Sequence, residues 1–477
     1  MKKILFVGSE ALPFASTGGL GDVLGSLPSA ICENSDFDVR VIMPLYSAIS
    51  SQWREKMKEE TTFYLSLAWR RLYCGIYSLK LKNVTYYFVD NEYYFNRYSL
   101  YGEYDDGERF AFFSMAVMEA IEKLSFYPDV LHAHDWQGAL SIIYLNHIYK
   151  AKKEYQGIKT VFTIHNIEYQ GKYDFAILGD VFSLSQRDAH LVEHDGVINL
   201  MKGAIEDSNR VTTVSPTYAL EIQTPNFSHG LHGSLKNNSH KLSGILNGID
   251  YNYYDPKKDR EISANYSSQN IQNKGVCKVN FQRDTGLYEN ESTPLLSVIS
   301  RLVSHKGIDL IEGGIVSLLE NTDAQFVVLG KGEERYENFF KDLENRFPKR
   351  VRAFITYDRE LSKKIYSASD IFLMPSHSEP CGLAQMIASR YGAIPVVRET
   401  GGLYDSIKPY YKEKNTIFGN GFTFAGYSAE ELFERTRAAI GLYLDKNLRK
   451  TFVRKIMRTD FSWKKSAKDY ISLYEHL

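Results

Sequence analysis

Short apolar runs, rich in β-branched and aromatic residues, recur along the first half of the chain at nearly regular intervals. Longer segments with a helical pattern separate them. Near-continuous apolar runs of this kind indicate parallel strands that are buried on both faces. In the first half the expected strands lie at 4–7, 39–43, 84–89, 129–134, 160–165 and 211–215.

The second half of the chain repeats this alternation after a polar stretch around 237–239. Its expected strands lie at 295–300, 325–330, 351–356, 370–376 and 393–397. We therefore predict an α/β protein with two doubly wound units in series, joined near residues 245–260. Ligands of such sheets bind beyond the carboxyl ends of the strands, so two facing edges would form an interdomain cleft.

Composition and charge narrow the class of function. A chain of 477 residues is too long to fold around one ordinary hydrophobic core. Its 57 Lys and Arg residues nearly balance its 58 Asp and Glu residues. Because the net charge is close to zero, the protein has no long-range electrostatic attraction for polyanions, and we expect neither a nucleic acid nor a membrane as partner. No apolar run approaches the roughly 18 residues of a membrane span. The four cysteines are far apart and lack metal-ligand spacing, which predicts a reducing compartment and a cytoplasmic protein.

Polar clusters follow the expected strands at the edge where this fold places its ligands. Three of them lie in the first half and four in the second. Because they share one type of edge, we expect them to build the functional site. The clusters are STGGLGDV (16–23), HAHDWQ (132–137), HNIEYQG (165–171), SRLVSHKG (300–307), TYDRE (356–360), PSHSEPCGLAQ (375–385) and RETGGLYD (398–405).

The sequence TGGL occurs twice, at 17–20 and 400–403. Glycines allow close backbone approach, and amides at a helix N-terminus favour an anion; a simple tight turn is the alternative. Neither copy has the dinucleotide pattern G-x-G-x-x-G, which argues against a dehydrogenase. The first loop carries no Lys or Arg. Arg301 and Lys306 follow a strand of the second unit. They could neutralise a diphosphate bound at the first loop, or they could form a surface ion pair.

The segment HAHDWQ offers two imidazoles, a carboxylate and an indole. We expect His132 and His134 to point to opposite faces of their strand, which makes a metal site improbable. One histidine should pack in the core, while Asp135 and Trp136 emerge at the ligand edge. His165 ends the next strand and can be structural or can donate a hydrogen bond beside Asp135.

Two side chains after the fourth strand of the second unit have alternative interpretations. Glu379 can cap the helix that follows it, or it can accept hydrogen bonds from sugar hydroxyls. Cys381 resembles a nucleophile, but no histidine is paired with it in the sequence, so we expect a packed thiol.

The ordered motifs resemble those of bacterial glycogen synthases and plant starch synthases over essentially the whole chain. This resemblance implies a GT-B fold, in which two Rossmann-like domains flank a deep cleft. It also implies transfer of glucose from ADP-glucose, or UDP-glucose, to the non-reducing end of an α-1,4-glucan such as glycogen, with retention and without a metal. The motifs are SEALPF, STGGLGDV, YGEYDDGERFAFFS, HAHDWQ, TIHNIEYQG, TTVSPTYA, LNGID, SRLVSHKG, SEPCGLAQ, TGGL and DFSW.

The resemblance implies three segments: an acceptor-side domain at 1–245, a nucleotide-sugar domain at 246–458, and a C-terminal helix at 459–477 that crosses back onto the first domain. It also implies roles for individual residues. The expected catalytic residues are Asp135, His165, Arg301, Lys306 and Glu379. Expected at the donor are Ser16, Gly18, Gly19, Tyr357, Cys381, Gly382, Leu383, Thr400, Gly401 and Gly402. Expected at the acceptor or transferred glucose are Tyr101, Trp136, Asn166 and Asn247.

Ser16 departs from the family pattern. The usual first motif is K-[TV]-G-G-L, and its lysine contacts the donor near the diphosphate; here Ser16 takes that place. Three interpretations follow: an active α-glucan synthase, a GT-B transferase with another donor or acceptor, and a donor-impaired homologue that only binds glucan. The sequence contains no convincing covalent nucleophile.

Overall fold

The computed structural model describes residues 1–414 and 416–477. It divides into two compact units: unit 1 comprises Met1–Gly248 with Trp463–Leu477, and unit 2 comprises Ile249–Ser462. Both units are α/β and built on a parallel sheet, so the expected fold class is confirmed. The expected domain boundaries, 245/246 and 458/459, fall slightly before these divisions.

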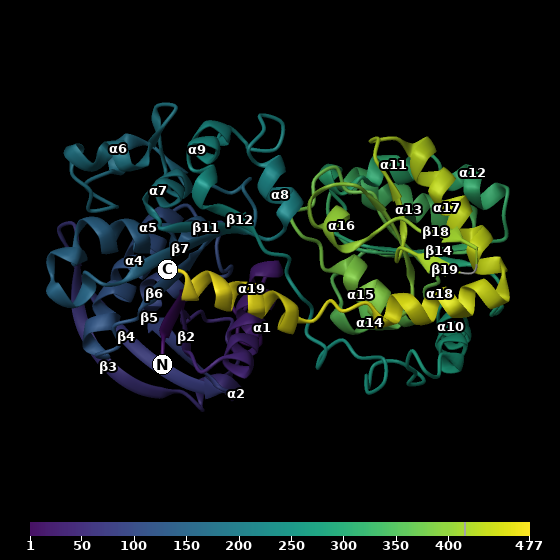
Figure 1. The fold of residues 1–477 in the computed structure, drawn as a ribbon, viewed down its shortest axis with the longest axis horizontal. Helices are drawn as coiled ribbons and strands as arrows, with labels where there is room; N and C mark the ends of the chain where they lie inside the picture. Colours follow the sequence, from purple (N-terminus) through teal and green to yellow (C-terminus); the bar gives the residue numbers. More distant parts are fainter. Residues whose placement is uncertain (415) are drawn as a thin grey trace. The chain divides into compact units, whose positions relative to one another are not determined.

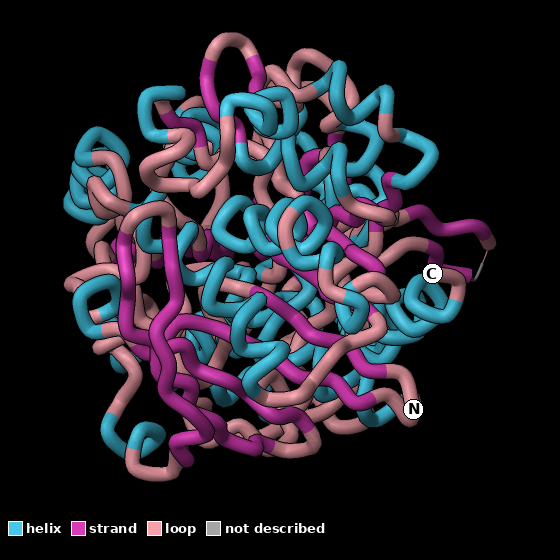
Figure 2. Tube along the Cα trace, turned by 90° about the vertical axis from the view of Figure 1, so that its left-hand side faces the viewer, coloured by secondary structure: helices cyan, strands magenta, loops and turns pink. Residues whose placement is uncertain are grey.

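Unit 1 is centred on a nine-stranded sheet, whose strands run side by side in Figure 2. Seven strands pair in parallel, and β3 and β4 add an antiparallel edge next to β5. In spatial order the strands are β12 (Leu242–Gly244), β11 (Arg210–Thr213), β7 (Lys159–Ile164), β6 (Val130–His134), β1 (Lys3–Val7), β2 (Asp38–Pro44), β5 (Val84–Asp90), β4 (Arg70–Leu81) and β3 (Lys58–Leu67).

The central strands of unit 1 are apolar because helices cover both faces of the sheet. Leu5 and Phe6 in β1, which point to opposite faces of the sheet, are both buried. The principal helices are α1 (Gly19–Asn34), α4 (Asp106–Lys123), α5 (Asp135–His147), α7 (Leu200–Asp207) and α19 (Trp463–Glu475). Shorter ones are α2 (Ser51–Arg54), α3 (Glu92–Phe95), α6 (Ala189–Val192), α8 (Pro216–Glu221) and α9 (His232–Asn237). A small sheet joins β8 (Lys172–Tyr173), β10 (Val197–Asn199) and β9 (Glu193–His194).

The C-terminal helix α19 belongs to unit 1, where it packs along α1 (Figure 1). Tyr470 and Tyr474 on α19 are fully buried, and the Tyr474 hydroxyl lies 2.6 Å from Nδ1 of His132 in β6. The end of the chain is therefore part of the core around β6.

Unit 2 is built on a six-stranded sheet in which every pair is parallel. A continuous apolar core packs between this sheet and its helices. The strand order is β15 (Val351–Phe354), β14 (Gln325–Leu329), β13 (Leu295–Ile299), β16 (Ile371–Met374), β17 (Ile394–Arg398) and β20 (Phe422–Phe424). A hairpin of β18 (Tyr411–Glu413) and β19 (Thr416–Phe418) lies outside the sheet.

The helices of unit 2 alternate with its strands, as a doubly wound sheet requires. They are α10 (Gln272–Thr285), α11 (Ile308–Glu312), α12 (Ile315–Glu320), α13 (Glu334–Arg346), α14 (Arg359–Ala368), α15 (Ala384–Arg390), α16 (Gly401–Ser406), α17 (Ala429–Leu444) and α18 (Lys446–Arg458). Among the described helices of both units, none has the length and apolar character needed to cross a membrane.

Candidate functional site

The strand order of each sheet identifies the edge at which a ligand can bind. In unit 1, β1 lies between β2 and β6; in unit 2, β13 lies between β14 and β16. The chain reverses its winding direction at these strands, and the crevice beyond their carboxyl ends is the usual ligand site. Glu10 and Asp135 follow β1 and β6, whereas Arg301 and Glu379 follow β13 and β16.

Asp135 and His165 lie together at this edge of unit 1. The Oδ1 atom of Asp135 accepts the backbone N–H of His165 at 2.7 Å, and the backbone N–H of Asn166 also donates to this carboxylate. Asp135 has φ of 51°, a left-handed conformation that aspartate tolerates better than most residues. Burial raises the pKa of Asp135 to about 7, although the two amides oppose the shift.

His134 contacts the side chain of His165: its Nδ1 lies 2.9 Å from Nε2 of His165. The rings of His132 and His134 are 4.2 Å apart, so the expectation that they point to opposite faces is wrong. Residues two apart on a strand share a face. Burial lowers the pKa of all three imidazoles, that of His165 to about 3, and all three are neutral near pH 7.

Glu10 organises the first glycine loop, a role that the sequence motifs did not predict. Its carboxylate, 2% exposed, accepts the backbone N–H groups of Thr17 and Gly18 and the Tyr101 hydroxyl. The Thr17 and Tyr101 hydroxyls also contact each other. The amide of Gly18 is therefore bonded to an anion of the chain itself. The sequence feature that could have indicated this role is a single acidic residue shortly after the first strand.

Ser16 and the two glycines that follow it form the entry to α1. Ser16 Oγ donates to the carbonyl oxygen of Gly18 at 3.1 Å, and it lies so close to Gly21 that a Cβ there would be 2.2 Å away. A Cβ added to Gly18 or Gly19 would meet no atom within 4 Å in the described structure. This side of the loop is therefore open.

The expected acceptor residues of unit 1 differ in accessibility. Trp136 is only 9% exposed and packs edge-on against Phe110 with a ring distance of 5.1 Å, so the expectation that it emerges is wrong. Tyr101 and Asn166 are half-buried beside Glu10 and Asp135. Asn247 is buried, and in the described structure its Oδ1 has no hydrogen-bond partner.

In unit 2, the structure joins Lys306 and Glu379, which the sequence placed in separate roles. Lys306 Nζ lies 2.6 Å from Glu379 Oε2, and Ser376 Oγ donates to the same oxygen at 3.1 Å. The Lys306 and Glu379 side chains are 14% and 8% exposed. Arg301, by contrast, is exposed, and no acceptor in the described part of the chain pairs with its guanidinium.

The second glycine loop packs directly on the segment that follows Glu379. A Cβ on Gly401, whose φ is 42°, would lie 2.0 Å from the carbonyl oxygen of Glu379. The amide of Gly402 donates to this same oxygen at 3.1 Å. A Cβ on Gly402 would lie 2.1 Å from the carbonyl oxygen of Cys381. Close loop packing therefore requires both glycines, and one amide of the expected phosphate cradle is already bonded.

The remaining donor-side residues surround these loops. Cys381 and Thr400 are buried, Leu383 is half-buried, and Gly382 has φ of 70°. Gln385, another residue that the sequence analysis missed, holds this segment by donating from Nε2 to the Gly382 carbonyl at 2.8 Å.

Tyr357 follows β15, and β14 separates that strand from β13. The residue is 76% exposed, and its hydroxyl accepts a hydrogen bond from Arg359 Nε at 2.9 Å. An exposed ring held at one end can stack against a flat ligand group.

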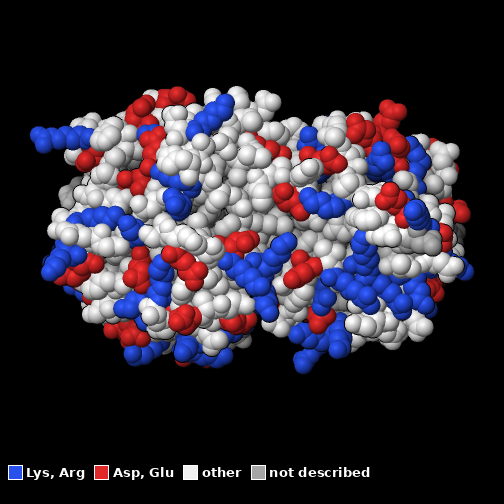
Figure 3. Space-filling view, in the orientation of Figure 1, with Lys and Arg blue, Asp and Glu red and all other residues white. Residues whose placement is uncertain are grey.

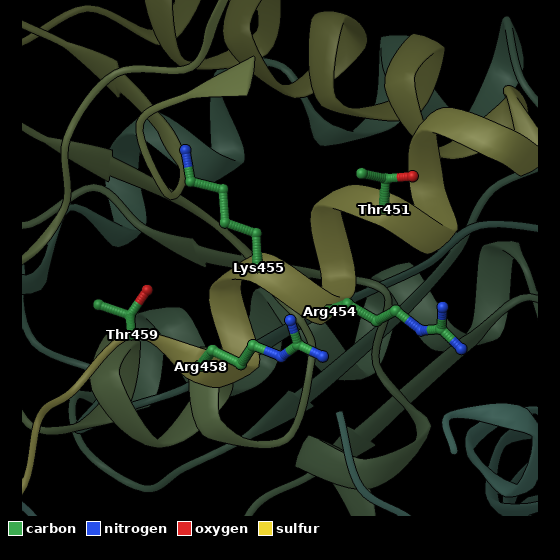
Figure 4. Close-up of a pocket in the computed structure, with 5 residues that line it drawn as sticks. All are labelled: Thr451, Arg454, Lys455, Arg458 and Thr459. Atoms are coloured by element: carbon green, nitrogen blue, oxygen red, sulfur yellow. The ribbon is translucent and has the colours of Figure 1, made fainter. Parts of the chain in front are cut away.

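The charged surface of unit 2 contains a hollow along α18, and none of the residues that line it belongs to the strand ends described above. Figure 3 shows Lys and Arg gathered over the α18 side of unit 2, and the hollow there is lined by Thr451, Arg454, Lys455, Arg458 and Thr459 (Figure 4). Arg454 and Lys455 already donate to backbone carbonyls of Gln269 and Ile417. In the described residues no group of three His, Cys, Asp or Glu side chains could hold a metal ion.

Comparison with known families gives two adjacent matches. A model of the starch synthase catalytic domain matches residues 3–237. A model of glycosyl transferases group 1 matches residues 283–456. The two matched ranges lie within unit 1 and unit 2 respectively.

Individual proteins match over their full length. A glycogen synthase of Clostridioides difficile is 46% identical, covering 100% of this chain and 99% of its own. One of Bacillus subtilis is 44% identical, covering 100% and 98%. The catalytic domain of starch synthase IV from Arabidopsis thaliana, solved with ADP and acarbose, has a TM-score of 0.91 at 34% identity, covering 100% and 99%. Sucrose-phosphate synthase from Thermosynechococcus elongatus shares the fold alone, with 13% identity and a TM-score of 0.62 over 100% and 99%.

Proposed function

The chain belongs to the glycogen synthase and starch synthase family of glycosyltransferases, and from this premise we propose its reaction in detail. It transfers glucose from ADP-glucose to the 4-hydroxyl at the non-reducing end of an α-1,4-glucan such as glycogen, and it retains the anomeric configuration. The enzyme class and the GT-B fold follow from the full-length matches. The donor, the acceptor and the residue roles are the proposal.

The observation that carries the proposal is the grouping of Arg301, Lys306 and Glu379 beyond β13 and β16. Two cations suit a diphosphate, and a buried carboxylate suits sugar hydroxyls. Breaking the anomeric C–O bond leaves negative charge on the departing diphosphate. Fixed cations that stabilise this charge provide the largest catalytic contribution in many enzymes.

In unit 1, we assign the transferring glucose to Asp135 and His165. Burial keeps the His165 imidazole neutral, so it can donate one hydrogen bond to a sugar hydroxyl without adding charge. Asp135 fixes the backbone of His165 and Asn166. These two residues act on the sugar rather than on the nucleotide.

The chemical step needs no covalent enzyme intermediate. The donor C–O bond breaks toward an oxocarbenium-like centre, and the acceptor hydroxyl forms the new C–O bond on the same face. The proton of that hydroxyl passes to the leaving phosphate oxygen, which balances the charge. We expect no metal requirement, because Arg301 and Lys306 provide the positive charge.

ADP-glucose is the donor that we propose first, with UDP-glucose as the alternative. Support comes from the plant starch synthase solved with ADP, and from the exposed Tyr357 ring that can meet a base. We also propose a cytoplasmic location, because the four cysteines form no disulfide in the described structure.

Ser16 supports a second candidate, a homologue that binds glucan but uses donor poorly. Neither Ser16 nor its hydrogen-bond partner supplies the positive charge of the family lysine. A GT-B transferase with another sugar donor is the remaining alternative.

The decisive experiment measures glucan elongation and donor hydrolysis with ADP-, UDP- and GDP-glucose, before and after exhaustive chelation. We expect elongation with ADP-glucose that chelation does not reduce. Arg301→Ala and Lys306→Ala should each lower turnover by orders of magnitude, since a hydrogen bond to a charged group contributes about 1.5–3 kcal/mol and more in a dry site. Arg283→Ala, which removes an exposed pair with Glu289, is the control. Near-normal turnover in both active-site variants would refute the diphosphate site.

A further inference from the structure

His165 is held at two points by two consecutive residues. Asp135 accepts its backbone N–H at 2.7 Å, and His134 Nδ1 lies 2.9 Å from its side-chain Nε2. In the described structure the other ring nitrogen of His165, Nδ1, has no hydrogen-bond partner. The contact with His134 therefore decides which nitrogen of His165 carries the proton, because a neutral imidazole has one donor and one acceptor.

The surroundings of His134 select between the two possible arrangements. Its Nε2 is buried and has no hydrogen-bond partner in the described structure. If the proton of His134 were on Nε2, the core would contain an N–H without an acceptor. If the proton is on Nδ1, only a lone pair is left unpaired. Buried unpaired N–H groups are rarer than buried unpaired acceptors. Nδ1 of His134 is therefore the donor in this contact.

The wall behind His134 fixes its position. Its ring packs against Phe6, with ring centroids 5.4 Å apart, and against His132 at 4.2 Å. His132 itself is bonded at both nitrogens, to the Tyr474 hydroxyl and to Thr163 Oγ1, each at 2.6 Å. His134 consequently packs against both a fixed imidazole and the phenyl ring of Phe6, and its Nδ1 contacts His165.

We propose that His134 is a positioning residue, which donates Nδ1–H to Nε2 of His165 and thereby holds His165 in the tautomer protonated on Nδ1. In this tautomer His165 offers an N–H to the sugar from the nitrogen that has no partner in the protein. The opposite tautomer would offer only a lone pair there. The step from tautomer to sugar binding rests on the proposed function; the tautomer itself does not.

The test is long-range ¹H–¹⁵N correlation spectroscopy of the full-length protein labelled with ¹⁵N-histidine, in which the two neutral tautomers give distinct patterns. The chain has 12 histidines, and loss of one pattern in His165→Gln assigns the signal of interest. We expect His165 to be protonated on Nδ1. Protonation on Nε2 in the wild-type protein would overturn the proposal without any activity measurement.

Variants separate this positioning role from a structural one. His134→Leu removes the donor, and we expect a mixed His165 tautomer and a kcat lowered roughly three- to tenfold, with little change in donor KM. His134→Asn keeps an amide donor near the Nδ1 position and should retain most of kcat. Tyr474→Phe is the matched control: it removes a buried bond to the neighbouring His132 and should lower stability while leaving the His165 tautomer unchanged.

Two outcomes contradict the proposal. One is an unchanged His165 pattern in folded His134→Leu; the other is an equal loss of kcat in His134→Leu and His134→Asn. If His134→Leu does not fold, the wild-type spectrum and His134→Asn still decide. A wild-type protein with the expected tautomer but without glucan elongation would refute the proposed function instead.

Discussion

Lys306 Nζ lies 2.6 Å from Glu379 Oε2, which joins the turn after β13 to the loop after β16. Both side chains are largely buried, and Ser376 Oγ donates to the same carboxylate oxygen. The group proposed for phosphate and the group proposed for glucose are thus bonded to each other before a ligand arrives. A bound donor must either contact Lys306 and Glu379 while they remain paired, or break the ion pair between them.

The first prediction concerns the stability of this pair. Glu379→Ala leaves the Lys306 ammonium buried and unpaired, and we expect it to lower the free energy of unfolding by roughly 3 kcal/mol. The double variant Lys306→Met with Glu379→Leu should recover most of this loss in urea unfolding, but should not recover activity. A double variant as unstable as Glu379→Ala would show that the pair itself, rather than an uncompensated charge, determines the effect.

The second prediction concerns the pH dependence of stability at Asp135. Burial raises its pKa to about 7, well above the usual value of about 3.9 in an unfolded chain. Between these values the folded state binds the extra proton, so this contribution to stability is complete at low pH and is lost as pH rises to about 7. Asp135→Asn cannot ionise. The free energy of unfolding of Asp135→Asn, relative to that of the wild type, should therefore rise by about 1.4 kcal/mol for each pH unit as the pH increases across that window.

Urea unfolding at intervals from pH 4.5 to 7.5 measures this difference. Asp180→Asn provides the control, because hydrogen bonds from Trp69 and Arg70 lower the pKa of the exposed Asp180, so that its difference from wild type should stay constant over this pH range. A constant difference between Asp135→Asn and wild type over the whole range would mean that Asp135 ionises normally. In a transfer assay, Asp135→Asn should also suppress glucosyl transfer more than nucleotide binding.

The third prediction concerns Glu10. Glu10→Ala removes the acceptor for the Thr17 and Gly18 amides and for the Tyr101 hydroxyl, so we expect a loss of about 1–3 kcal/mol in stability. Hydrogen exchange at the two amides should become at least about tenfold faster. Tyr101→Phe, which leaves both amides bonded, should have the smaller effect on exchange. Unchanged exchange in Glu10→Ala would mean that the loop does not depend on this carboxylate.

The buried parallel strands were predictable because both faces of each are covered, which produces continuous apolar runs. The hairpin of β3 and β4 was missed because its strands alternate between exposed and buried positions and begin with charged residues. The short β20 gave no clear run of its own. The fold then places Asp135 beside His165, and Lys306 beside Glu379, in contacts that join polar clusters from different strand ends.

What the sequence could not provide were contacts between distant positions. Lys306 and Glu379 are separated by 73 residues, and Glu10 and Tyr101 by 91. The error at His132 and His134 had a different cause, since the two-residue period of a strand puts both on one face. Trp136 was misplaced because it follows the ligand edge in sequence while its ring turns into the core against Phe110.

The last prediction returns to Ser16, where the family has lysine. If Arg301, Lys306 and the second glycine loop carry most of the diphosphate charge, the serine weakens donor binding rather than the reaction itself. Ser16→Lys should then lower the KM for nucleotide-glucose with a smaller change in kcat, since a contact made in both ground and transition states mainly alters binding. The gain should be about 1–2 kcal/mol, or roughly five- to thirtyfold in affinity.

Two control variants determine how a lysine at position 16 acts. Ser16→Met has similar length and no charge, so it should leave KM near the wild-type value. The Glu10 carboxylate lies in the same loop and can capture the new ammonium, and Glu10→Gln combined with Ser16→Lys removes this competitor. If the wild-type protein is inactive and Ser16→Lys restores turnover, the result would favour the donor-impaired homologue. Weaker donor binding in both Ser16→Lys and the double variant would contradict this account of the loop, because a cation beside its open side should attract a diphosphate once the Glu10 carboxylate is removed.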